Sequence, residues 1–233
     1  MNSMLLGLVV DLNQLGAERF DRGETIQAVV AFRQALLVFN ALHLSMGLDD
    51  IVGLEQFGVF ADIGLLSPRR TVVVDAISQE QIFMRPLQID RTRFGEALLF
   101  ARARRGSAVL TARATVLVNL ALCVQVASEK FGHEKWSKEA VFLYQAAAAH
   151  LYVIEQDSAN VVLLSMYTFH NLALLYYETL DYTECRVCLE GLWGVLCYGC
   201  IECPSLLSGR QYIEKIRHTT YFLSQPPTTA ACA

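Results

Sequence analysis

Residues 171–192 read NLALLYYETLDYTECRVCLEGL and carry the clearest helical pattern in the chain. Apolar residues recur at helical spacing on both sides of Asp181, which belongs to the residue types favoured at helix N-termini. Ala173 and Cys185 are small, which allows two antiparallel helices to approach closely. The stretch therefore predicts helices near residues 160–179 and 182–198, joined by a short turn.

The same pattern occurs twice more in the chain. NLAL recurs at 119–122, and the related QLGA occupies 14–17. In each case a break follows, and a second helix then carries small, large and small residues at spacings of four and three. These residues are Ala28, Phe32 and Ala35 in the first pair, Ala140, Tyr144 and Ala147 in the second, and Cys185, Leu189 and Leu192 in the third.

This arrangement resembles the tetratricopeptide repeat (TPR), a helix–turn–helix family with a period of about 34 residues. The resemblance implies an all-α, TPR-like α-solenoid of about three helix-turn-helix pairs. The first pair is expected in residues 1–46, and the second and third in 107–203. Residues 204–233 are expected to cap the last pair, with one more helix over 209–223, and to end in a frayed tail. Leu12 and Asn40 depart from the family's usual Trp and closing Pro, and the middle pair is about two helical turns longer than the family pattern.

Residues 47–106 have no counterpart in the repeat and are predicted to be an irregular or β-hairpin insertion. Thr71–Val74 and Ile82–Ile89 are rich in β-branched and aromatic residues, and Ser78–Gln81 is the expected connection between them. Residues 69–113 contain nine arginines against four acidic residues, although the whole chain has a net charge of −4. The stretch lacks the aromatic residues interleaved with basic ones that bind single-stranded nucleic acid, so we expect a solvated surface and no nucleic-acid partner.

The resemblance also implies a binding surface for a protein or peptide partner. In TPR proteins the first helices of the pairs line a concave groove. In this family an Asn at the position of Asn119 and Asn171 often holds the backbone of a bound peptide. The alternative is that each amide makes its hydrogen bonds within its own helical array. If both amides face a partner, replacing them with Ala is expected to leave the stability nearly unchanged. The partner-binding residues implied in this chain are Asn13, Asn119, Leu122, Gln125, Tyr167, His170, Asn171, Leu174 and Tyr177.

The C-terminal cysteines give an alternative function, a metal- or redox-responsive module. Cys185-x2-Cys188 and Cys197-x2-Cys200-x2-Cys203 lie close together, and such pairs can bind zinc. Eight residues between the pairs is a short spacing, and Cys185 occupies a packing position, so we favour buried thiols and expect no metal or cofactor. No nucleophile, phosphate-binding or dinucleotide motif is present. The sequence therefore predicts a non-catalytic scaffold or adaptor rather than an enzyme.

The composition indicates where in the cell the chain is expected and how its ends are expected to be covered. Hydrophobic residues are 54% and charged residues 18%, which predicts a folded protein. Seven cysteines, an odd number, indicate free thiols in a reducing, cytoplasmic environment. The apolar run Met4–Val10 is too short and lacks the basic flank of a signal peptide, while the uncharged stretch Ser158–Tyr177 contains amides and a histidine that disfavour a membrane span. The ends of a three-pair array need cover, which residues 204–223 or a second copy of the chain would supply.

Overall fold

A computed structural model describes residues 2–46, 66–67, 83–89, 102–154, 159–202 and 210–224. These residues form an all-α fold of seven helices with two short strands. The predicted helices are found, with boundaries that differ by a few residues. In chain order the elements are α1 (Asn2–Asp21), α2 (Thr25–Met46), β1 (Leu66–Ser67), β2 (Gln88–Ile89), α4 (Arg102–Phe131), α5 (Glu134–Val153), α6 (Ala159–Glu178), α7 (Tyr182–Glu202) and α8 (Arg210–Ser224).

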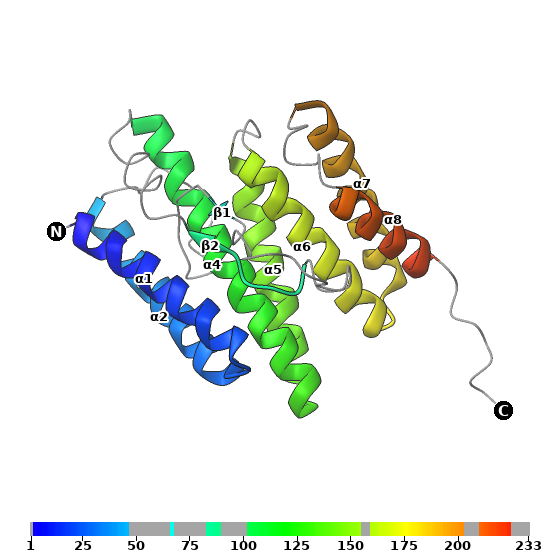
Figure 1. Cartoon of the computed structure of the whole chain (residues 1–233), viewed down its shortest axis with the longest axis horizontal. Coiled ribbons are helices and arrows are strands. Elements are labelled where there is room, and N and C mark those ends of the chain that lie inside the picture. Colours follow the sequence, from blue (N-terminus) through cyan, green and yellow to red (C-terminus); the bar gives the residue numbers. More distant parts are fainter. Residues whose placement is uncertain are drawn as a thin grey trace.

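The helices pack in sequential pairs. Helix α1 packs mainly on α2, α4 on α5, and α6 on α7, while α2 also contacts α4 and α5 contacts α6. Figure 1 shows this order across the molecule, from the blue α1–α2 pair to the orange α7. The C-terminal helix α8 packs against α6 and α7 at the end of the row. The prediction of an all-helical protein built from consecutive helix pairs is confirmed.

Small residues set the distance between the helices of a pair. A Cβ atom at Gly16 of α1 would lie only 2.6–2.8 Å from ring atoms of Phe32 in α2. The ring of Phe32 is fully buried against this glycine. The small–large–small residues predicted in the second helices of all three pairs are likewise buried, so the repeat pattern marks the packed face of each pair.

The turns of the first and third pairs have the same geometry. Gly23 lies just after α1 and has a φ of 77°, and Leu180 lies just after α6 and has a φ of 63°. In both turns the residue after the left-handed position donates its N–H to a carbonyl five residues back, from Glu24 to Arg19 and from Asp181 to Tyr176. This is the Schellman arrangement, which satisfies the last carbonyls of a helix. Two separate stretches of sequence thus form one turn motif.

The central region differs from the predicted hairpin. Strand β2 lies within the predicted second strand, but its antiparallel partner is β1, with Leu66 opposite Ile89 and Ser67 opposite Gln88. The predicted first strand, Thr71–Val74, lies outside the described residues. Helix α4 begins at Arg102, inside the predicted insertion. Phe83, Leu87 and Ile89 are buried in the core, so the described part of this region is an integral piece of the packing.

One helix in the described residues has the length and hydropathy of a membrane span. It covers Val109–Phe131 of α4, and 94% of its most apolar window is buried inside the protein. A central core helix has these same properties, so its length and apolar composition are weak evidence for a membrane span. The uncharged stretch Ser158–Tyr177, for which the sequence disfavoured a membrane span, does not meet the same criterion within the described residues.

Candidate functional site

The segment Phe83–Ile89 lies across the first helices of the three pairs. We call this segment the buried segment, and we call the surface of α1, α4 and α6 that contacts it the asparagine face. Figure 1 shows the buried segment, in teal, crossing α4 towards α6. Three asparagines, one from each first helix, hydrogen-bond its backbone: Asn13, Asn119 and Asn171.

Two of these amides converge on one residue of the buried segment. The Leu87 N–H donates to Asn119 Oδ1 at 2.7 Å, and Asn119 Nδ2 donates back to the Leu87 carbonyl at 2.7 Å. The N–H and C=O of a residue in an extended chain point to the same side, so one carboxamide can pair with both. Asn13 Nδ2 donates to the same carbonyl at 3.1 Å, and its Oδ1 accepts from Asn119 Nδ2 at 2.9 Å. The two asparagines therefore fix each other and Leu87.

The third amide holds the other end of the segment. Asn171 Nδ2 donates to the Phe83 carbonyl at 3.1 Å and to the Tyr144 hydroxyl at 3.0 Å. Tyr144 in turn donates to Gln125 Oε1 at 3.3 Å. Burial raises the pKa of the Tyr144 hydroxyl well above its usual value, so this group remains a donor.

A buried histidine joins the asparagine face to α8. His170 Nδ1 lies 3.0 Å from Asn171 Oδ1, and its Nε2 lies 2.9 Å from the Thr219 hydroxyl. Because an amide oxygen only accepts, Nδ1 carries the proton and Nε2 accepts from Thr219. Burial and, to a smaller extent, the positive charge of Lys215 lower the pKa of His170 to about 4 against the opposing effect of the hydrogen bond to Asn171, so the ring is neutral near pH 7. The ring also packs on Phe83, with centroids 4.5 Å apart.

The structure brings five of the nine predicted site residues onto the buried segment. Asn13, Asn119 and Asn171 bind its backbone, and His170 and Tyr167 contact the Phe83 ring, with Tyr167 perpendicular to it at 5.0 Å. The other four lie apart from these contacts. Leu122 and Gln125 are buried in α4, and Leu174 and Tyr177 are half-buried on α6, where Tyr177 packs on Phe222 of α8.

Asn119 and Asn171 are fully buried and bonded within the chain. The expectation that their replacement leaves the stability unchanged is therefore reversed, because each replacement would remove buried hydrogen bonds. Whether the same amides bind a partner stays a prediction. The residues that sequence reasoning missed are the occupants of the face, Phe83 and Leu87. The apolar run Ile82–Ile89 predicted a strand at these residues. It did not predict which helices the strand would contact.

The cysteines of α7 divide into two groups. Cys185 and Cys188 are buried, and burial raises the pKa of both thiols, to about 12 for Cys188. Cys197 and Cys200 are exposed, and Cys203 lies outside the described residues. Among the described residues, no group of three or more His, Cys, Asp or Glu side chains gathers closely enough to hold a metal ion. The alternative of a cysteine-based metal site stays a prediction without a supporting contact.

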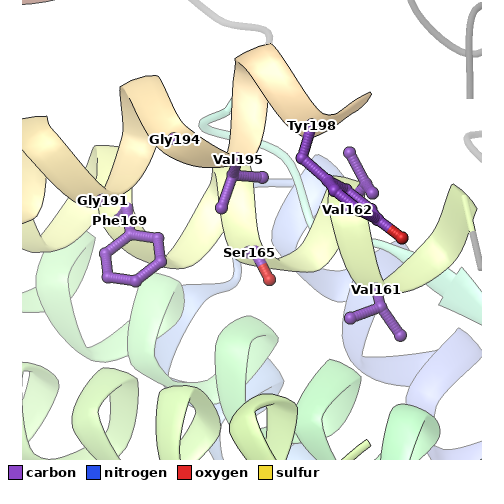
Figure 2. A pocket seen from close by; sticks show the side chains of 8 residues that line it. All are labelled: Val161, Val162, Ser165, Phe169, Gly191, Gly194, Val195 and Tyr198. Carbon is purple, nitrogen blue, oxygen red and sulfur yellow. The ribbon is translucent and has the colours of Figure 1, made fainter. Parts of the chain in front are cut away.

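A hollow lies between α6 and α7, away from the buried segment. Figure 2 shows its lining, with Phe169 beneath Gly191 and the hydroxyl groups of Ser165 and Tyr198 among valine side chains. Its volume is about 280 Å³. Its polar groups are these two hydroxyls, and neither is paired with a histidine or carboxylate in the lining, so the hollow offers shape and apolar contact rather than acid–base chemistry.

Comparisons with known proteins identify no relative. No protein-family model, curated protein or solved structure matches the chain.

Proposed function

We propose that the chain is a non-catalytic scaffold for protein–protein interaction, and that its helix pairs form a TPR-like solenoid that holds a partner's peptide on the asparagine face. One observation carries this proposal. Amides from the first helices of three consecutive pairs all bind the backbone of a single non-helical segment. A surface that binds the backbone of one segment in this way has the donors and acceptors needed to bind another.

The chemistry of the contacts supports a peptide as the ligand. A carboxamide offers both a donor and an acceptor, which is what a peptide unit requires on each side. The amides bind only backbone groups of the segment, so they position its backbone without selecting a side chain. The equivalent turns at Gly23 and Leu180 support the proposed repeat, because they give the first and third pairs the same helix–turn–helix geometry.

The proposal is tested by site-specific photo-crosslinking in cells. A photoreactive aromatic residue is placed at Leu174, which lies one helical turn from Asn171 on α6. The matched control carries it at Trp193 of α7, a side chain that is 46% exposed. We expect position 174 to capture a partner that position 193 does not capture.

The captured segment must then bind alone. A synthetic peptide with the sequence at the crosslink should bind the purified protein and protect position 174 from crosslinking. Identical crosslinks at both positions, or a captured segment that does not bind in isolation, would overturn the proposal.

A further inference from the structure

The buried segment shows what a ligand of the asparagine face looks like. The asparagine side chains bond only to backbone atoms of Phe83 and Leu87, so these hydrogen bonds fix the path and direction of the segment. The segment runs from α6, at Phe83, towards α1 and α4, at Leu87. Selectivity must therefore come from the side chains that enter the face.

Three side chains of the segment are buried in the core. Phe83 is fully enclosed and packs between Tyr167 and His170, and Leu87 and Ile89 are also buried. Met84 to Pro86 and Gln88 are only half-buried. The face therefore accommodates an aromatic residue, a leucine four positions later and a branched aliphatic residue two positions after that.

The helices make most of their contacts with one another, and the segment contributes three side chains to the core that they form. Sequential packing of α1, α2, α4, α5, α6 and α7 supplies most of the tertiary contacts of the fold. Residues 90–101 join the segment to α4, and a connection of that length can span up to about 40 Å when extended. The segment can thus leave the face without unwinding α4, and water would then satisfy the three amides.

We propose that the buried segment is an internal competitor for the peptide site, displaced by a partner segment with the same aromatic-x3-Leu-x-aliphatic pattern. This inference rests on the proposed function. A tethered ligand acts at an effective concentration of about millimolar for short flexible connections, so a free partner competes against a high local concentration. The apparent affinity of the partner equals its intrinsic affinity multiplied by the fraction of molecules whose face is open.

The inference is tested with a fluorescent peptide that copies residues 81–91, and fluorescence anisotropy measures its binding. Leu87→Ala weakens the internal segment, and Met84→Ala, at a half-buried position, is the matched control. We expect the peptide to bind the Leu87→Ala protein at least tenfold more tightly than the wild type, and the control to resemble the wild type. A peptide with Ala at both the Phe83 and Leu87 positions should not bind either protein.

The outcomes separate the two proposals. Equal binding to the wild type and the Leu87→Ala protein would overturn internal competition and leave the peptide site standing. No binding to any folded variant would show that the face does not accept this class of peptide, and would count against the proposed function as well.

Hydrogen exchange of the wild type tests whether the segment is displaced, and it does so even if Leu87→Ala does not fold. A displaceable segment opens without global unfolding, so the Leu87 N–H should exchange faster than the buried core of α4, and excess peptide should speed it further. Exchange of Leu87 at the rate of the α4 core, unchanged by peptide, would show that the segment is a fixed part of the fold.

Discussion

Gly16 shows how the absence of a side chain determines helix spacing in this protein. The Phe32 ring occupies the space that a Cβ atom at Gly16 would enter. Gly194 of α7 is a contrasting helical glycine, because a Cβ atom there would meet no heavy atom within 4 Å. The two glycines have the same backbone role and opposite surroundings, so their substitution separates packing from helix propensity.

We predict that Gly16→Ala lowers the free energy of unfolding by about 1–2 kcal/mol. The overpacking cost of about 1–3 kcal/mol exceeds the gain of about 0.5–1 kcal/mol from placing Ala inside a helix. Gly194→Ala, the control, should raise the free energy of unfolding by about 0.5–1 kcal/mol. Urea denaturation of both variants measures the difference, and equal stabilities would contradict the close packing of α1 on α2.

At the scale of the helices, the sequence determines the pairs and their turns. Helical periodicity and the small–large–small pattern are local signals, so they located all seven described helices and the packed face of each pair. The buried segment could not be placed in this way. Its contacts join residues as far apart as Phe83 and Asn171, 88 positions in sequence, and no local pattern encodes such a contact. The repeat register predicted that Asn119 and Asn171 bind a partner's backbone, and it did not predict their hydrogen bonds to a segment of the chain itself.

The turn after α6 carries strain that a single substitution should relieve. Leu180 adopts a φ of 63° and is 69% exposed. A left-handed conformation costs an L-residue about 1–2 kcal/mol, and glycine avoids this cost while losing about 0.5–1 kcal/mol of conformational entropy on folding. We therefore predict that Leu180→Gly raises the free energy of unfolding by about 0.5–1 kcal/mol. Leu180→Ala keeps the strain and should not be stabilising, and thermal or urea denaturation distinguishes the two variants.

Asn119 connects a helix to the buried segment, and its loss should be costly. Asn119→Ala would remove three hydrogen bonds and leave the Leu87 N–H buried without that acceptor. We predict a decrease of about 2–4 kcal/mol in the free energy of unfolding, since an unsatisfied buried group costs about 1–3 kcal/mol. Gln14→Ala removes an exposed amide of α1 and is the control, with a change within about 0.5 kcal/mol. A stable Asn119→Ala protein would show that the segment contributes little to the fold.

The proposed dual use of these amides also affects how binding must be measured. If the asparagines hold both the internal segment and a partner, replacing one weakens both ligands, and the two effects on apparent affinity partly offset each other. Substitutions in the segment itself change only the competitor. For this reason Leu87 is the informative position for affinity, and Asn119 is the informative position for stability.

At the scale of the whole molecule, buried polar groups connect elements that are distant in sequence. The network from Gln125 through Tyr144, Asn171 and His170 to Thr219 joins α4, α5, α6 and α8. A chain of this kind is stable only while each member keeps its protonation state. His150 of α5 is a second buried histidine, and burial together with the positive charge of Arg113 lowers its pKa to about 3. The fold therefore depends on two neutral histidines.

We predict that the protein loses stability as the pH falls from about 7 to 5. In the unfolded chain a histidine binds a proton below about pH 6.5, whereas folded His170 resists protonation until about pH 4 and His150 until about pH 3. The unfolded state thus binds more protons in this window, and each histidine decreases the free energy of unfolding by up to about 1.4 kcal/mol per pH unit. Asn at position 170 can still hydrogen-bond but cannot titrate, so His170→Asn should remove roughly half of the pH dependence between pH 6 and 5. His218→Gln, which alters an exposed histidine of α8, should retain the wild-type slope. Urea denaturation at several pH values measures these slopes, and a stability that is flat between pH 7 and 5 would show that neither histidine is held neutral by the fold.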